Sequence, residues 1–203
     1  MSFDKWRGVA VAICAVLASA ALAQDGGDAR PTTSAMADAL LGGETALQHH
    51  DVRRLMDAAV MLARLHAHPV KGTGVDPAAG GTTDLAARWA HQAVMWGASP
   101  RQLPIWRGRM LGPGYRAIAL APGAQFHTRQ VFAGGQKARV EAVALTQGRF
   151  SLSVVDDTPR SVCTRDGSEG GLACYWVPTF SAPHDIAVQS KQTKPGRFYL
   201  VTY

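Results

Sequence analysis

The sequence lacks the short motifs that mark the commonest catalytic and nucleotide-binding sites. It contains no G-x-S-x-G segment, which argues against the nucleophile elbow of a serine hydrolase. It has no H-E-x-x-H segment, the zinc-binding pattern of many metalloproteases. The glycine-rich stretches 112–114 and 167–171 lack the Lys-Ser ending and the strand-to-helix setting of a phosphate loop. We therefore expect no enzymatic activity, no nucleotide and no cofactor.

Charged residues are also scarce, and the apolar run near the N-terminus is short. Charged residues make up 18% of the chain and hydrophobic residues 47%, a balance typical of a globular protein. The apolar run Val9–Leu17 is too short to span a bilayer. The formal net charge is +6, and its 203 residues suffice for one good-sized domain or two small ones.

The first 23 residues have the organisation of a secretory signal peptide. Lys5 and Arg7 precede the apolar run, and Ala21-Leu22-Ala23 supplies small residues at positions −3 and −1 of a cleavage site. Cys14 follows a large residue, where a lipoprotein signal requires a small one. We predict a periplasmic or secreted protein without a stable membrane span after cleavage; an uncleaved anchor is the alternative.

Cysteine is rare, and signal cleavage would leave a single pair. Of three cysteines, Cys163 and Cys174 remain in the mature chain. An even pair in an oxidising compartment predicts a disulfide, which for so short a loop contributes about 2–3 kcal/mol. The alternative, half of a metal or redox site, lacks both a C-x-x-C spacing and nearby histidines.

We expect residues 24–33 to form a flexible polar leader, and the apolar residues after it recur at helical spacing. The pattern of residues 34–98 predicts three helices, and Gly42-Gly43 weakens the first and could divide it. Asp51 is a candidate N-cap for the second helix, which Pro69 would end; Thr83 or Asp84 can cap the third, with Gly97 after its end. Residues 99–114, punctuated by proline and glycine, predict a linker.

From residue 115 onward, apolar residues recur at every second position instead of at helical spacing. Phe150, Leu152 and Val154 alternate with Ser151 and Ser153, the pattern of a strand with one buried face. Glycine-containing turns separate eight such segments, at 115–121, 125–133, 138–145, 149–156, 160–165, 173–177, 185–190 and 197–203. We predict an α+β fold in which a small helical region precedes an antiparallel, jelly-roll-like β-sandwich over 115–203.

The second half of the chain resembles the bacterial pre-peptidase C-terminal domain family of β-sandwiches. The resemblance rests on ordered segments: Leu120–Gly123, Phe126–Phe132, Gly134-Gly135, Ala138–Val140, Phe150–Asp156, Ala182–Val188 and Gly196–Leu200. Pro183-His184 stands where the family has Gly-Tyr. The resemblance implies an extracytoplasmic, non-catalytic module. Some relatives bind calcium through acidic residues, and Asp156 and Asp157 occupy a comparable place, but two neighbouring carboxylates are too few for a site.

Histidine supplies the metal alternative. His49, His50, His66, His68 and His91 fall on or beside the predicted helices and could converge on zinc or copper. His66 and His68 are two residues apart, which is not the i, i+4 spacing that places two imidazoles on one helical face. Surface or capping positions are the simpler interpretation.

A basic and aromatic cluster near the linker is the candidate binding site. Arginine interleaved with aromatic rings can hold anionic or sugar surfaces by hydrogen bonding and stacking. The candidate residues are Trp106, Arg107, Arg109, Tyr115 and Arg116. The competing interpretation is that Trp106 packs between the two halves while the arginines stay solvated.

Together these observations predict an exported binding or accessory module of the bacterial cell envelope. Its partner would be an envelope protein, a polysaccharide or an anionic surface, not nucleic acid; the oligomeric state stays open. One alternative is a chaperone-like protein that docks a partner through the helical part. The other is a metal-binding protein or metalloenzyme built on the histidines.

Overall fold

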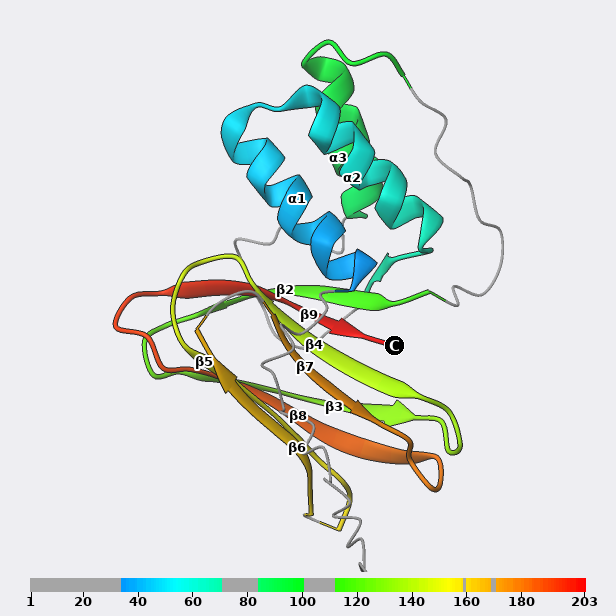
Figure 1. The fold of residues 1–203 in the computed structure, drawn as a ribbon, viewed down its shortest axis with the longest axis vertical. Helices are drawn as coiled ribbons and strands as arrows, with labels where there is room; N and C mark the ends of the chain where they lie inside the picture. Colours follow the sequence, from blue (N-terminus) through cyan, green and yellow to red (C-terminus); the bar gives the residue numbers. More distant parts are fainter. Residues whose placement is uncertain (1–33, 71–83, 101–111, 159, 169–170) are drawn as a thin grey trace, which may run out of the picture. The chain divides into compact units, whose positions relative to one another are not determined.

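The computed structural model describes residues 34–70, 84–100, 112–158, 160–168 and 171–203, all within one compact unit (Figure 1). The helices are α1 (Ala35–His49), α2 (Val52–Arg64) and α3 (Leu85–Met95). The strands are β1 (His68–Pro69), β2 (Gly114–Leu120), β3 (Gln125–Phe132), β4 (Ala138–Ala144), β5 (Phe150–Val155), β6 (Ser161–Gly167), β7 (Gly171–Trp176), β8 (Ala182–Ser190) and β9 (Gly196–Thr202). The predicted signal peptide and leader lie outside the described residues.

Two sheets form a sandwich, as the alternation predicts. One has the strand order β1-β2-β9-β4-β7 and the other β3-β8-β5-β6. Every pairing is antiparallel except that of the two-residue strand β1 with β2. Eight of the nine strands that the described residues form correspond to the predicted segments, and β1 is the addition. The α+β class with a sandwich is confirmed.

The core between the sheets follows from the period of two. Phe150, Leu152 and Val154 of β5 are each at most 3% exposed, and they share a core with residues such as Ile186 of the neighbouring strand β8 and Phe198 of β9 in the opposite sheet. Cys163 of β6 and Cys174 of β7 form the predicted disulfide, with their Cα atoms 5.8 Å apart. Because β6 and β7 are the last strands on one side of their sheets, the disulfide ties the sheets together there.

The first helix is continuous, which corrects the expectation that Gly42-Gly43 divides it. Ser34 caps α1 by accepting a hydrogen bond from the Ala37 N–H at 3.0 Å, and the helix runs unbroken to His49. A Cβ atom on Gly43 would lie 2.1 Å from the Trp89 ring, whereas one on Gly42 would meet nothing within 4 Å. Gly43 is therefore the residue that lets α3 approach α1 closely.

The other two helices begin where their caps predict. The Asp51 and Asp84 side chains accept hydrogen bonds from the N–H groups of Arg54 and Ala86. Gly97 follows α3 with a φ of 98°, the conformation expected of a glycine after a helix end. The second helix ends at Arg64, well before Pro69, which pairs in β1 instead. No helix in the described segments is long and apolar enough to cross a membrane.

The helices and the sandwich share a hydrophobic core. Tyr115, Val143, Tyr199 and Val201, on the outer face of the first sheet, cluster with the buried residues of all three helices. Two hydrogen bonds also join the helical part to strands β2 and β9. The Leu85 N–H donates to the Tyr115 hydroxyl at 2.7 Å, and the Tyr199 hydroxyl donates to Glu44 at 2.6 Å.

Candidate binding surface

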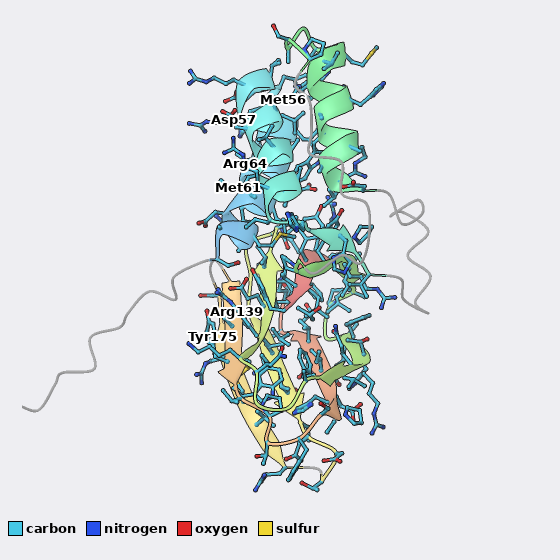
Figure 2. The ribbon with its side chains drawn as sticks, turned by 90° about the vertical axis from the view of Figure 1, so that its right-hand side faces the viewer. Met56, Asp57, Met61, Arg64, Arg139 and Tyr175 are labelled. Carbon is cyan, nitrogen blue, oxygen red and sulfur yellow. A yellow bond between two sulfur atoms is a disulfide. The ribbon has the colours of Figure 1, made fainter. Side chains whose placement is uncertain are left out.

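Three side chains form a row across the outer face of the first sheet, beside the part covered by helices. The Arg139 guanidinium lies 4.7 Å from the centre of the Tyr175 ring and 5.4 Å from that of the Tyr203 ring. Arg139 and Tyr175 are directly opposite each other on β4 and β7, and Figure 2 shows both on this face, below the helices. Tyr175 is 52% exposed and Tyr203 41%, so both rings reach solvent. The row offers stacking and hydrogen bonding to a ligand.

A buried carboxylate, that of Glu141, holds Arg139 of this row in place. Glu141 is 3% exposed, and it accepts hydrogen bonds from Arg139 and from the Ser34 hydroxyl. Removing Arg139 would leave a buried negative charge without its partner, a change that typically costs about 3–5 kcal/mol. Burial raises the pKa of Tyr203, and its hydrogen bond with Ser34 acts in the opposite direction. The row is thus part of the folded framework as well as of the surface.

Large apolar side chains project at one end of the sandwich, from the end of β3 and from the turn after β7. Val131 is 67% exposed, Val177 57% and Phe180 79%. Two turns lie there, the β3–β4 turn (133–137) and the β7–β8 turn (177–181), and hydrogen bonds hold them together: the Gly135 N–H donates to the Pro178 carbonyl at 2.7 Å, and the Gly134 N–H to the Ser181 hydroxyl at 3.0 Å. Figure 1 shows both turns at the same end of the sandwich. We name this end the turn-end surface, formed by Val131, Lys137, Tyr175, Val177 and Phe180.

An aromatic cluster inside the sandwich braces these turns. The Phe132 and Trp176 rings meet edge to face with centroids 4.8 Å apart, and His184 lies 5.3 Å from Trp176. The Trp176 indole N–H donates to His184 Nε2 at 3.2 Å, while Nδ1 lies 3.1 Å from the Ala182 carbonyl oxygen. This pairing corresponds to a neutral imidazole that carries its proton on Nδ1. Phe132 and Trp176 pack in the sandwich core, while their chain neighbours Val131 and Val177 are exposed.

Of the predicted binding residues, Tyr115 and Arg116 lie in the described part of the chain. Tyr115 is 3% exposed, beneath the helices, where burial raises its pKa to about 12. Arg116, the next residue, turns to the other side of β2, and its guanidinium lies 5.1 Å from the centre of the Phe126 ring. The structure therefore does not bring these two side chains together. Trp106, Arg107 and Arg109 lie outside the described residues, so their role stays a prediction.

The histidines proposed for a metal site are dispersed. His49 and His50 end α1, and the His50 ring stacks on Trp96 with centroids 4.7 Å apart. His66 and His68 follow α2, and His91 belongs to α3. Among the residues that the structure describes, no three His, Cys, Asp or Glu side chains group in a way that could hold a metal ion.

Asp156 has a structural role in the turn after β5. Its Oδ1 accepts hydrogen bonds from the N–H groups of Thr158 and Arg160 and from the Thr158 hydroxyl, at 2.8–3.0 Å. These hydrogen bonds, led by the one from the Thr158 hydroxyl, lower the pKa of Asp156. Turn formation therefore accounts for Asp156 without a calcium ion.

A separate hollow of about 270 Å³ lies between the first half of α2 and the segment that follows α3. Val52 and Met56 of α2 line it together with Ala98, Arg53 and Ser99. It is small, mostly apolar and open to solvent, and none of the predicted site residues contributes to it.

The sequence reasoning missed Tyr175, Val177 and Phe180. One signal was present: the segments 130–140 and 172–184 contain no Asp or Glu but carry apolar and aromatic residues next to Gly, Pro and Ser. Exposed apolar residues in turns, where polar residues normally prevail, indicate an interaction surface.

Comparison with known proteins finds only distant structural similarities. No family model matches the chain, and no curated protein sequence matches it. Among solved structures, the pre-peptidase C-terminal domain of a collagenase from Bacillus anthracis is similar at 7% identity, covering 43% of this chain and 88% of that domain, with a TM-score of 0.36. A periplasmic inhibitor of g-type lysozyme from Aeromonas hydrophila is similar at 12% identity, covering 44% and 83%, with a TM-score of 0.34. The resemblance to the pre-peptidase C-terminal family is thus a distant structural one, without support from sequence comparison.

Proposed function

We propose that this protein is an exported, non-catalytic binding module that holds a component of the bacterial cell envelope through its turn-end surface. The observation that carries the proposal is the projection of Val131 from the end of β3 and of Val177 and Phe180 from the β7–β8 turn, which hydrogen bonds join to the β3–β4 turn. Several large apolar side chains exposed at one end of a domain are unfavourable in water, and such an arrangement is typical of an interaction site. The tight bracing beneath it is what preorganised binding requires.

Two further features support the extracytoplasmic setting. The N-terminal 23 residues have the organisation of a signal peptide. The Cys163–Cys174 disulfide is typical of proteins that fold in an oxidising compartment.

Retention on isolated envelope fractions tests the proposal. The full chain and its Phe180→Ser variant are mixed with washed envelope material, sedimented, and quantified at low and high salt. Met95→Ser is the matched control, because Met95 is 68% exposed but lies on α3, in the helical part. We expect Phe180→Ser to weaken retention roughly tenfold, since one fully buried phenylalanine side chain contributes at most a few kcal/mol, while Met95→Ser behaves as the parent protein.

A second variant separates this surface from the linker cluster that the sequence analysis singled out. The Arg107→Ala, Arg109→Ala pair removes two cations of that cluster. If the pair abolishes retention while Phe180→Ser leaves it unchanged, the binding site lies in the linker and the turn-end proposal is wrong. Retention that is unaffected by Phe180→Ser contradicts the proposal in any case.

A further inference from the structure

We infer that the partner of the turn-end surface is the headgroup region of an anionic phospholipid bilayer, into which Phe180 and Val177 insert. This inference rests on the proposed function and narrows it to one class of ligand. It follows from the charge, the shape and the chemistry of the side chains that this end of the sandwich presents.

The charge of the surface is positive. Segments 130–140 and 172–184 contain no Asp or Glu, and their two lysine and arginine residues are Lys137 and Arg139. Arg139 pairs with Glu141, so Lys137 is the cation that this surface presents. The nearest carboxylates are already neutralised: Glu141 is buried against Arg139, and Asp185 lies 3.8 Å from Arg129. Lys137 is exposed in the β3–β4 turn itself. A cation beside projecting apolar groups complements a surface that is apolar within and negatively charged outside.

The shape of the surface favours a bilayer over a protein partner. Val131, Val177 and Phe180 project separately from a strand and a turn, whereas a protein interface needs a continuous, shape-complementary core. A fluid interface can close around separate projecting groups without such complementarity. An acidic protein partner is therefore an outcome for the experiment to detect.

The side-chain types match successive depths of a membrane interface. Phe180, 79% exposed, provides the deepest apolar group. Tyr175 carries a half-exposed ring and a hydroxyl, and tyrosine is enriched at the headgroup level. Lys137 supplies the ammonium group that attracts lipid phosphates, an effect of roughly fivefold in affinity per cation.

Sedimentation with protein-free vesicles tests the inference. The full chain is mixed with phosphatidylcholine vesicles and with vesicles of phosphatidylcholine and phosphatidylglycerol at seven to three. We expect binding to the anionic vesicles, weaker binding to the neutral ones, and a loss of binding as salt is raised. Phe180→Ser should weaken binding roughly tenfold. Lys137→Glu should weaken it by at least about fivefold.

Two control variants match these changes elsewhere in the molecule. Met95→Ser removes an apolar side chain from α3 that is 68% exposed, compared with 79% for Phe180. Lys194→Glu reverses an exposed lysine in the β8–β9 turn (191–195), at the opposite end of β8 from the β7–β8 turn. Both should bind anionic vesicles as the parent protein does. Thermal melts confirm that every variant is folded.

The outcomes separate this inference from the proposed function. If anionic vesicles do not bind the protein, or bind Phe180→Ser equally well, the lipid inference is wrong. If envelope material still retains the protein through Phe180 in that case, the proposed function stands and the partner is an envelope protein or polysaccharide. If neither material binds the protein through Phe180, both proposals fail.

Discussion

At the scale of single residues, Gly42 and Gly43 show how neighbours in one helix acquire different roles. Both are interior helical glycines, which intrinsic propensity alone marks as equally unfavourable. Only Gly43 faces Trp89, a fully buried side chain of α3, while the space beside Gly42 is open. Tertiary packing therefore overrides propensity at one position and leaves the other unchanged.

This difference predicts opposite effects of the same substitution. Gly43→Ala should lower the free energy of unfolding by about 1–3 kcal/mol, because the new methyl group would overlap the Trp89 ring. Gly42→Ala should raise it by about 0.5–1 kcal/mol, because alanine favours the helix and meets no neighbour. Urea unfolding of both variants provides the measurement. A stabilising effect of Gly43→Ala would show that Trp89 does not pack against α1.

At the scale of elements, buried tyrosines join the helical layer to the first sheet. Burial raises the pKa of Tyr115 to about 12, with a further contribution from the Asp84 carboxylate, while the Leu85 N–H acts against it. Burial also raises the pKa of Tyr199, and the Glu44 carboxylate adds to the effect. In both cases the folded protein favours the neutral phenol.

The raised pKa values predict a loss of stability in alkali. Above a pH of about 10 the unfolded chain releases tyrosine protons that the folded protein still holds, so the free energy of unfolding falls as the pH rises from about 10 to 12. For Tyr115 the slope is at most about 1.4 kcal/mol per pH unit. Tyr115→Phe should make the fall shallower, although it lowers stability at neutral pH by leaving the Leu85 N–H without its acceptor.

Urea midpoints between pH 9 and 11.5 measure this slope. Gly42→Ala is the control, because it changes stability without changing any titrating group, so its curve should run parallel to that of the parent protein. A Tyr115→Phe curve parallel to the parent curve would contradict the placement of Tyr115 beneath the helices.

The strands were largely predictable because their pattern is local. A period of two, with glycine in the turns, places Phe150, Leu152 and Val154 on one buried face whatever the strand order. The disulfide also followed from the cysteine count and the expected compartment. The strand order and the helix-on-sheet core depend on contacts distant in the sequence, which no local pattern contains.

The binding surface was much less predictable for the same reason. Val131 and Phe180 are about fifty residues apart in the chain, and only the sheet pairing brings their segments to one end of the sandwich. Tyr115 is the reverse case, a predicted surface residue that is buried. Its sequence neighbours suggested an exposed aromatic side chain, but its register on β2 places it beneath the helices. The exposure of the Tyr175 ring likewise depends on the strand order, because β7 is the last strand of its sheet.

At the scale of the whole molecule, the helical layer, the disulfide and the proposed binding surface occupy different parts of the sandwich. The helical layer covers part of one outer face and shares its core with the sheet. The disulfide closes one side, where β6 and β7 meet. The turn-end surface has exposed apolar groups beside the internal aromatic cluster, and this is the basis for proposing that binding occurs there.

Hydrogen–deuterium exchange of the full chain, with and without isolated envelope material, tests this placement most directly because it needs no substitution. We expect slower exchange on binding in peptides that cover 131–139 and 175–181, and unchanged exchange in helices α1 to α3. Protection confined to the helices or to residues 101–111, or no protection anywhere, would contradict the assignment of binding to the turn-end surface.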